Sequence, residues 1–250
     1  MLKVKSISFF ISHFHKMSSA KSYLRYLKRF LFSLIGKDHF IHPDCDLDYS
    51  IKNDEYGAWP IIHNFFKIPP KVYSFGVGDN ISWDLNVIWQ YKSIVYAYDP
   101  TPRSVEWIEK QNLPDEFKFI KIGISNHNGE EFFSFPKDDR HVSFKKNIQS
   151  EYKSTSFQVS TLDVLMKKNG HQSIDLLKLD IEGFEYNVIE DIISKSIFPS
   201  ILLVEFHHRF GEFGLDQTRN AINKLKSSGY SVFYVSDNGE EFGFVKKDLL

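Results

Sequence analysis

Carboxylate and imidazole side chains follow two apolar runs in the second half of the chain. In "DLLKLDIEGFEYNVI", Asp180, Glu182 and Glu185 fall within six residues, and Gly183 provides a turn before a helical pattern. Carboxylates at the end of a strand lie where open α/β sheets bind their ligands. The alternative is structural, because Glu182 or Glu185 can cap the helix that follows.

The next apolar run, in "SILLVEFHHRF", brings further acid–base groups to the same edge. Glu205 and His207 share one face of a strand with period-two alternation. Imidazole titrates near neutral pH, so His207 or His208 is a candidate general base, with Glu182 as the carboxylate alternative. Asp180 is expected to orient substrate or cofactor. Either histidine alone is compatible with an ordinary surface position, but the coincidence of two strands ending in such groups favours function.

An earlier stretch, "KVYSFGVGDNISWD", predicts a strand, a glycine turn and a helix. The strand is Val72–Phe75, and Gly76 and Gly78 allow backbone to approach a ligand closely. Ser82 is the expected N-cap of the helix. This order of elements is how an open α/β sheet usually builds a nucleotide pocket.

The residues around this turn indicate which nucleotide it binds. Asp99 stands 21 residues beyond Gly78 at the end of the next strand, where an acid can accept the ribose hydroxyls of an adenosine. The third glycine of a dinucleotide fingerprint is replaced by Ile81, and Asp79 would repel a pyrophosphate. A sulfonium cofactor, S-adenosylmethionine, therefore fits better than NAD. The alternative is a structural turn with a solvated Asp99.

From residue 70 onwards strands and helices alternate, which predicts a mostly parallel sheet covered on both faces. The expected strands are Val72–Phe75, Ile94–Tyr98, Phe117–Ile124, Asp175–Asp180, Ile201–Phe206, Tyr230–Val235 and Glu241–Val245. The expected helices are Trp83–Tyr91, Pro102–Gln111, Leu162–Lys168, Glu185–Lys195 and Leu215–Ser228. A hairpin or loop is inserted between the third and fourth strands, and the last two strands form an antiparallel hairpin around Asp-Asn-Gly.

The first 69 residues form a separate segment in this interpretation, with residues 70–250 as the catalytic domain. Residues 1–37 contain eight Lys or Arg and no acid. Residues 20–35, "AKSYLRYLKRFLFSLI", predict a basic amphipathic helix. We expect its apolar stripe to pack on the domain, with docking to a membrane surface or a partner as the alternative. Residues 38–60 read as an irregular linker or cap.

Composition excludes several classes of protein. The chain of 250 residues is 42% hydrophobic, which is enough for a substantial core, and its net charge of −1 gives no general attraction to nucleic acid. The single cysteine, Cys45, excludes an internal disulfide framework and suits a reducing compartment. We expect a cytoplasmic protein, with membrane association as the alternative, and we interpret Cys45 as an ordinary loop residue.

The sequence strongly resembles the FkbM family of S-adenosylmethionine-dependent methyltransferases. The resemblance covers Lys71 to Leu250 and rests, in order, on "SFGVGDNISWD", "YAYDPTP", "IKIGISNHNGE", "VSTLDVLM", "DLLKLDIEGFEYNVI" and "ILLVEFH". It implies a class I methyltransferase fold, which is a Rossmann-like seven-stranded sheet with a C-terminal antiparallel hairpin, here with an N-terminal helical extension. It also implies O-methylation of hydroxyls on sugars, polyketides and related compounds.

The resemblance implies roles for individual residues. The cofactor-binding residues would be Gly76, Gly78, Asp79, Asn80, Asp99, Pro100, Gly123, Ile124 and Asp180. Gly76, Gly78 and Asp79 would line the methionine end of the cofactor. Asp99 would hold the ribose, and Gly123 and Ile124 would border the adenine. Asp180 and Glu182 would lie beside the reacting centre.

We therefore expect an S-adenosylmethionine-dependent O-methyltransferase that acts on a small molecule or a glycan-type acceptor. A divalent ion held by Asp180, Glu182, Glu205 and His207 is a weaker alternative, because carboxylates beside a cationic cofactor need no metal. A non-catalytic scaffold and an NAD-dependent oxidoreductase are further alternatives. Nucleic-acid methylation is disfavoured, because no Asn/Asp-Pro-Pro-aromatic motif follows the fourth strand.

The acceptor itself is not identified by the sequence. Residues 131–158 and the N-terminal segment are expected to shape its pocket, because such insertions overhang the strand ends. Arg140, His141, Lys145 and Lys146 are available there for an anionic or sugar substrate. Tyr56, Trp59 and Trp83 either stack on a sugar or belong to the core. The oligomeric state is left open.

Overall fold

The computed structural model describes residues 20–51, 59–134, 145–146, 154–209 and 214–250. Tyr56, Arg140 and His141 lie outside this described part.

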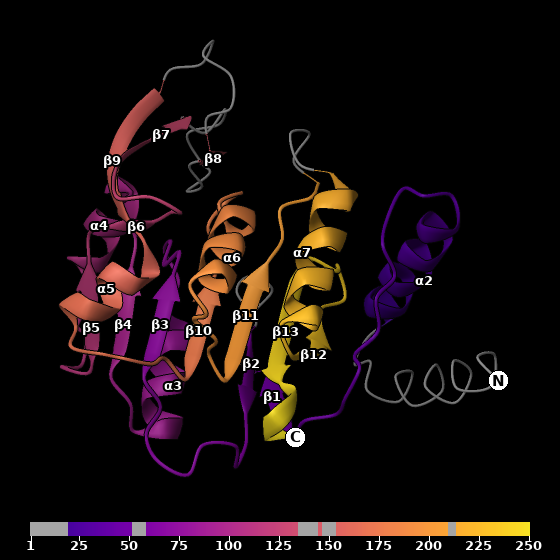
Figure 1. Ribbon diagram of the computed structural model, residues 1–250, viewed down its shortest axis with the longest axis horizontal. Helices are drawn as coiled ribbons and strands as arrows, with labels where there is room; N and C mark the ends of the chain where they lie inside the picture. The colour runs from indigo at the N-terminus through magenta and orange to yellow at the C-terminus, as the bar shows by residue number, and fades with distance from the viewer. Residues whose placement is uncertain (1–19, 52–58, 135–144, 147–153, 210–213) are drawn as a thin grey trace.

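Seven strands form the central sheet in the order β12-β13-β11-β10-β3-β4-β5 (Figure 1). They are β3 (Val72–Phe75), β4 (Val95–Tyr98), β5 (Phe117–Ile120), β10 (Leu176–Leu179), β11 (Ile201–Glu205), β12 (Tyr230–Val235) and β13 (Glu241–Lys246). The five strands from β5 to β11 are parallel, and β13 is antiparallel to both of its neighbours. The predicted sheet is confirmed, and the hairpin turns back so that β13 lies inside the sheet and β12 forms its edge.

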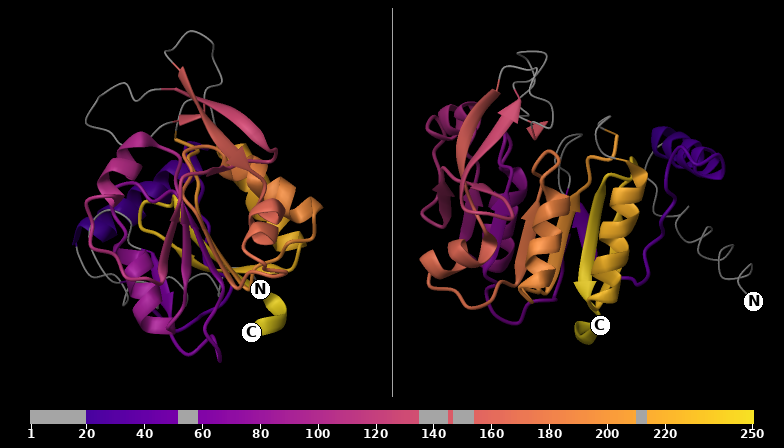
Figure 2. Two further views of the ribbon diagram at one scale, coloured as in Figure 1. Left: turned by 90° about the vertical axis from the view of Figure 1, so that its left-hand side faces the viewer. Right: turned by 45° about the horizontal axis from the view of Figure 1, so that its top comes forward.

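Helices cover both faces of this sheet, as Figure 2 shows. Helices α3 (Ser82–Tyr91) and α4 (Pro102–Ile108) lie on one face, and α5 (Leu162–Lys168), α6 (Glu185–Ser194) and α7 (Leu215–Ser227) lie on the other. A short 3₁₀ turn, η1 (Lys247–Leu249), ends the chain. Side chains of β3 alternate between two cores: Val72 packs with α3 and α4, whereas Tyr73 and Phe75 pack with α5 and α6. Parallel strands covered on both faces are apolar throughout for this reason.

The predicted third strand is divided in two. The amide of Ile122 donates to the carbonyl of Ile120 at 2.9 Å, and this tight turn separates β5 from β6 (Gly123–Ile124). Strand β6 joins a second sheet with β7 (Gly129–Ser134), β8 (Lys145–Lys146) and β9 (Ser154–Ser160), in the order β6-β9-β7-β8. The inserted hairpin predicted here is confirmed, and it rises above the carboxyl ends of the central strands (Figures 1 and 2).

The N-terminal segment contains more structure than the sequence predicted. Helix α2 (Ala20–Leu34) is confirmed, and the stretch interpreted as an irregular linker contains a small antiparallel pair, β1 (Tyr49–Ile51) and β2 (Pro60–Ile62). Trp59, Ile61 and Ile62 are almost fully buried in the same core as Val72 and Val87. The last part of this segment therefore packs into the same core as the central sheet.

Helix α2 presents an unexpected face to the fold. Tyr26 and Arg29 point inward, with only 7% and 6% of their surface exposed, whereas four leucines of the stripe (Leu24, Leu27, Leu31 and Leu34) are exposed. The prediction that the leucine stripe packs on the domain is wrong. Within the described part of the chain, no helix combines the length and apolar character needed to cross a bilayer.

Candidate functional site

The glycine turn and the acidic motif meet at the carboxyl edge of the sheet. Gly76 follows β3 with φ +81°, and a Cβ placed on it would lie 1.6 Å from the carbonyl oxygen of Asp180. Only glycine permits this approach. The Gly78 position is different, because it has φ +59° and a Cβ there would face open space. The structure thus brings the two predicted motifs into contact and leaves room above the second glycine.

Asp99 lies beneath the turn and is 5% exposed. One of its carboxylate oxygens accepts hydrogen bonds from the amides of Val77 and Gly78, both at 3.0 Å, and from the Ser104 hydroxyl at 3.0 Å. The other accepts from the amide and hydroxyl of Thr101 at 2.9 and 2.6 Å. A carboxylate offers about four lone-pair sites. Asp99 therefore holds the glycine turn in place, and a ribose contact would require one of these donors to give way.

The start of α3 differs from the prediction at one residue. Ser82 is the first helical residue and not the N-cap, and the side-chain oxygen of Asn80 accepts its amide proton at 2.9 Å. Asp79 pairs with Arg103 at 3.5 Å, and both side chains are more than 40% exposed. An exposed pair of this kind contributes little energy. Asp79 and Asn80 thus remain accessible at the turn.

Pro100, Gly123 and Ile124 lie together behind Asp99. A Cβ on Gly123 would be 3.2 Å from the Pro100 ring and 3.1 Å from the Val159 side chain, so both side chains pack closely against the Gly123 backbone. The side chain of Ile124 is 3% exposed and belongs to the core with Tyr98. This packing does not support an adenine contact from the Ile124 side chain.

A buried lysine joins the two motifs, and sequence reasoning missed it. Lys178 of β10 is 5% exposed, and its ammonium donates to the Gly76 carbonyl at 3.1 Å and lies 3.5 Å from the Asp180 carboxylate. It also lies over the ring of Trp59 at 5.2 Å. A lysine inside an otherwise apolar strand is the signal that could have identified it, since unpaired lysine is rarely buried.

The second motif forms an acidic cluster around one imidazole. The Nε2 atom of His207 lies 3.5 Å from Glu182 and 3.8 Å from Glu205. The contact with Glu205 agrees with the predicted strand alternation. Glu182 has φ +53°, a left-handed conformation that is uncommon for a residue with a side chain. Such backbone strain concentrates at functional sites.

Glu185 holds the other side of the same ring. Its side chain is fully buried and accepts hydrogen bonds from the amides of Gly183 and His207, and its Oε1 lies 3.2 Å from His207 Nδ1. Burial alone would lower the pKa of His207, but the hydrogen bond and charge of Glu185, together with Glu182 and Glu205, raise it to about 10. The imidazole is therefore protonated at neutral pH, and it does not suit the role of general base.

A family comparison agrees with this geometry. The sequence model of the methyltransferase FkbM domain matches residues 73–232, which contain both motifs and, apart from Val72, the five parallel strands of the central sheet. The chain belongs to the FkbM methyltransferase family. A rat protein named probable methyltransferase-like protein 24 is 23% identical over 191 residues, which cover 72% of this chain and 47% of the relative. The chain thus spans about half the length of that relative.

Within this FkbM site the two adjacent histidines are separated. His208 points away from the carboxylates and packs against His39, with ring centroids 4.6 Å apart. Burial, and then the positive charges around it, lower the pKa of His208 to about 3. His208 therefore lies outside the cluster of His207.

Three of the four groups considered for a metal come together in the FkbM site. Ligand atoms of Asp180, Glu205 and His207 lie within 4.8 Å of one another, and Glu182 is not part of that group. The Lys178 ammonium beside Asp180 and the proton held by His207 oppose a cation here. Burial and the charge of Asp180 raise the pKa of Glu205 well above its ordinary value. The group of Asp180, Glu205 and His207 therefore offers a cation less negative charge than two carboxylates would suggest.

The aromatic side chains considered for sugar stacking belong to the core. Trp59 is 1% exposed and Trp83 is 4% exposed, and both lie in the core beneath α3. What remains at the edge of the FkbM site is a carboxylate surface, from Asp79 through Asp180 to Glu182, with no guanidinium apart from that of Arg103 among the contacts described above. Asp180 and Glu182 already face the positive charges of Lys178 and His207, so this surface does not by itself select a cationic ligand, but its carboxylates disfavour a pyrophosphate.

Proposed function

We propose that this chain is an S-adenosylmethionine-dependent O-methyltransferase acting on a hydroxyl of a small-molecule or glycan-type acceptor. The observation that carries the proposal is the contact between Gly76 and the backbone of Asp180, which places the glycine turn beside the carboxylate cluster. When bound there, S-adenosylmethionine supplies a methyl group on a sulfonium, which an acceptor oxygen takes as it loses its proton.

The residues present fit such a cofactor. The open space at Gly78 accommodates a ligand close to the backbone, and Asp79, Asn80 and Asp180 offer acceptors for an ammonium group. Ile81 is 5% exposed and packs in the core, at the position where a dinucleotide fingerprint has its third glycine. These features support a sulfonium cofactor over NAD.

Within this proposal Glu182 is the general base, and His207 is a positioning residue. Glu182 is 22% exposed at the strand exit, and its carboxylate lies 3.5 Å from the His207 ring. His207 is anchored by Glu185 on its far side, so the ring fixes where the Glu182 carboxylate lies. A positioned base contributes roughly 10²- to 10⁴-fold to a proton transfer of this kind. Asp180, tied to Lys178, would orient the cofactor.

The small sheet above the strand ends supports an acceptor pocket on that side. Strands β7 and β9 pair over six residues and project beyond the carboxyl edge, where Figure 1 places them above β3 and β4. An acceptor that enters from this edge would lie between the small sheet and the carboxylate cluster. A glycan or glycolipid acceptor is our proposal for the substrate class, by analogy with the reactions of the family.

Calorimetric titration of the full chain with S-adenosylhomocysteine, run beside NAD, tests the cofactor. We expect binding of S-adenosylhomocysteine, a loss of at least tenfold in Asp180→Asn, and unchanged affinity in Asp163→Asn, an exposed carboxylate that pairs with Lys195. Binding of NAD alone would support an oxidoreductase, and binding of neither would support a scaffold.

Transfer of a labelled methyl group to a panel of hydroxyl acceptors tests the reaction. In Glu182→Gln we expect kcat to fall roughly 100-fold while S-adenosylhomocysteine still binds. In His207→Gln we expect a smaller loss of kcat. Full turnover in Glu182→Gln would remove the base assignment and leave the cofactor proposal intact.

A further inference from the structure

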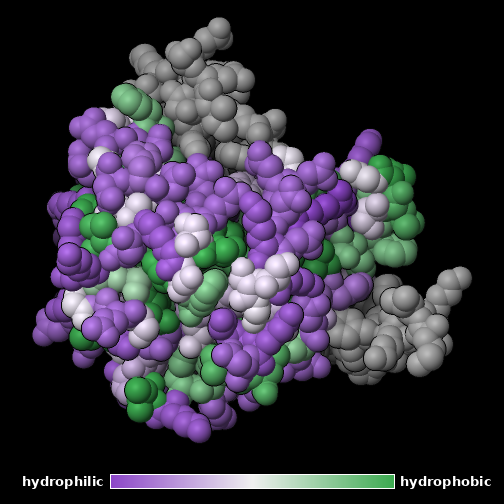
Figure 3. Space-filling view, viewed as in Figure 1, coloured by the Kyte–Doolittle hydropathy of each residue, from purple (hydrophilic) through white to green (hydrophobic). Residues whose placement is uncertain are grey.

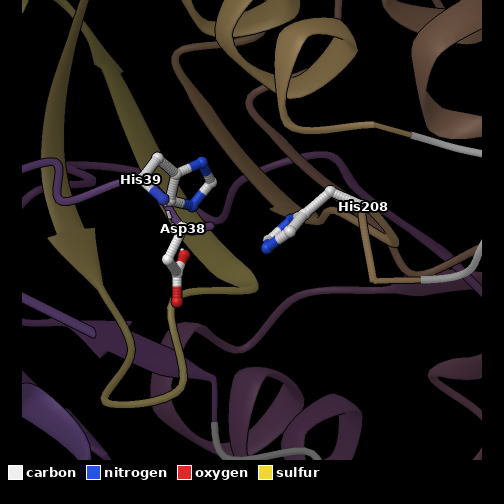
Figure 4. A group of neighbouring side chains, drawn as sticks. All are labelled: Asp38, His39 and His208. Carbon is white, nitrogen blue, oxygen red and sulfur yellow. Dashed lines mark hydrogen bonds between the residues drawn. The ribbon is translucent and has the colours of Figure 1, made fainter. Parts of the chain in front are cut away.

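A second cluster of ligand-type side chains lies behind the methyltransferase site. Asp38 and His39, which follow α2, meet His208, which follows β11 (Figure 4). All three side chains are buried, with 5%, 2% and 6% of their surface exposed. The cluster therefore joins the N-terminal segment to the strand exit that carries His207.

The imidazoles of this cluster have nitrogen atoms without hydrogen-bond partners. Nε2 of His39 lies 3.0 Å from the carbonyl oxygen of Gly239, so it carries the proton and leaves the lone pair on Nδ1. That Nδ1 atom is buried with no partner, and neither nitrogen of His208 has one, among the described residues. A buried polar atom without a partner costs about 1–3 kcal/mol. Three nitrogen atoms in one small volume therefore require an explanation.

The donor atoms are close enough to share one ion. Ligand atoms of Asp38, His39 and His208 lie within 4.8 Å of one another, and Figure 4 shows the ring of His208 directed toward the other two. Tetrahedral zinc with bonds of about 2.0–2.1 Å to nitrogen holds its ligands roughly 3.4 Å apart. A movement of about 1 Å by these side chains closes the difference. The bond from His39 to the Gly239 carbonyl is the arrangement that orients metal-binding histidines.

Two arginines oppose a cation here and are largely engaged elsewhere. Arg209 lies 3.3 Å from Asp38 but also 3.2 Å from Glu240. Arg29 lies 4.0 Å from Asp38 and donates to the carbonyl of Ser236 at 3.1 Å. One oxygen of Asp38 accepts only the amide of His39, at 2.7 Å, and keeps a lone pair for an ion.

We propose that Asp38, His39 and His208 bind a transition-metal dication of the zinc type. Two imidazoles and one carboxylate are the ligands that zinc and its neighbours prefer. The ion would fasten the N-terminal segment to the end of β11, one residue from His207. The site is separate from the carboxylate cluster, because His208 and His207 point in opposite directions from adjacent positions.

Zinc binding by the full chain, freed of metal with a chelator, tests this site. The probe is Zn²⁺ in competition with a chromophoric chelator. We expect one tight site in the unmodified chain, at least a tenfold loss of affinity in His39→Gln and in His208→Gln, and unchanged affinity in His63→Gln. Asp180→Asn should also keep full affinity, which distinguishes this site from the group of Asp180, Glu205 and His207.

A thermal melt with and without Zn²⁺ separates binding from misfolding. A ligand that binds only the folded chain raises its Tm. We expect Zn²⁺ to raise the Tm of the unmodified chain and of His63→Gln, and to leave the Tm of folded His208→Gln unchanged. Equal zinc affinity in His208→Gln and the unmodified chain, or loss of binding in Asp180→Asn alone, would overturn the proposal.

The exposed leucines of α2 carry a second, independent inference. Leu24, Leu27, Leu31 and Leu34 are 51–68% exposed and recur every three or four residues, so they share one side of the helix. Figure 3 shows apolar residues gathered on this part of the molecule. Contiguous apolar patches of this kind mark interaction sites on soluble proteins.

The charges beside this stripe favour an anionic lipid surface as its occupant. Arg25, Lys28 and Lys37 are exposed next to the stripe, and residues 1–37 contain no carboxylate to compete with them. A 15-residue helix is about 22 Å long. This length allows it to lie in the membrane interface, but it is too short to span the hydrocarbon core of a bilayer, which is about 30 Å thick. We infer that α2 binds the surface of a membrane rich in anionic lipid with its leucine stripe inserted.

Sedimentation with vesicles tests this inference. The probes are vesicles of phosphatidylcholine alone and of phosphatidylcholine with 30% phosphatidylserine. We expect the full chain to bind only the anionic vesicles, Leu27→Ser/Leu31→Ser to lose at least tenfold in binding, and Ile68→Ser, exposed elsewhere, to bind normally. Equal binding of the leucine variant would overturn the inference. So would a stable dimer that the same variant dissociates, since a second copy would then cover the stripe.

Discussion

At the scale of single residues, two glycines of one turn have different roles. Gly76 touches the backbone of Asp180, and Gly78 faces open space. We expect Gly76→Ala to lower the free energy of unfolding by about 2–5 kcal/mol, because the cost of the left-handed conformation adds to that of an overpacked contact. Gly78→Ala should cost only about 1–2 kcal/mol, the conformational part alone. Urea unfolding of both variants measures the difference, and equal losses would contradict the close approach of the two motifs.

Cys45 offers a residue-scale test of reactivity. Burial, followed by the charges of Asp44 and Asp46, raises the pKa of its thiol to about 11. The thiolate fraction at pH 8 is then roughly 200-fold lower than for an unperturbed cysteine. Alkylation by iodoacetamide should be correspondingly slow at pH 8 and should accelerate until the pH reaches about 11. Rapid labelling at pH 8, matching a cysteine-containing peptide, would show an activated thiol.

At the scale of elements, the pair of His207 and Glu185 ties the end of β11 to the start of α6. Removing the imidazole leaves a fully buried carboxylate without its counter-charge, which typically costs about 3–5 kcal/mol. We expect His207→Ala to be far more destabilising alone than in combination with Glu185→Gln. A double-mutant cycle in urea measures this coupling.

The matched control for that cycle is the exposed pair of Lys224 and Glu190, which joins α7 to α6. Exposed pairs contribute about 0.2–1 kcal/mol, so this cycle should show little coupling. Similar coupling in the two cycles would contradict the buried ion pair at His207. Both pairs include a glutamate of α6, and they differ in burial, since the His207 pair is buried and the Lys224 pair is exposed.

The side chains that follow the ends of β3 and β11 could be predicted from the sequence, because their placement depends on local patterns. Alternation correctly placed Glu205 and His207 on one face, and the glycine turn after β3 is confirmed. The pairing of Glu185 could not be predicted, since a glutamate in a first helical turn is also an ordinary cap. The role of Lys178 depends on the carbonyl of Gly76, which is 102 positions away in the sequence. Contacts at that distance leave no local pattern.

At the scale of the whole molecule, the sequence pattern wrongly predicted which face of helix α2 packs against the rest of the protein. Amphipathicity predicts that a helix has two faces, but it does not tell which face the rest of the protein covers. In α2 the polar Arg29 points inward because the β12–β13 turn offers it carbonyl acceptors, and the leucines point outward. The family match begins at residue 73 and says nothing about this arrangement.

The packing of this segment leads to a prediction about where the chain can be shortened. Trp59, Ile61 and Ile62 are almost completely buried against the sheet, and each such side chain contributes about 1.5–3 kcal/mol. Their sum, roughly 5–9 kcal/mol, is comparable to the whole stability of a typical domain, about 5–15 kcal/mol. A chain of residues 70–250 should therefore fail to fold, although it contains every strand of the central sheet.

A chain that begins at Asp38 provides the control, because it lacks α2 but keeps all three core side chains. We expect it to unfold cooperatively with a lower Tm, since it loses the contacts of Tyr26 and Arg29. Circular dichroism melts of the two shortened chains show whether each of them folds. Cooperative unfolding of residues 70–250 would show that the core between the sheet and α3 forms without β2. The boundary predicted at residue 70 would then be a true domain limit.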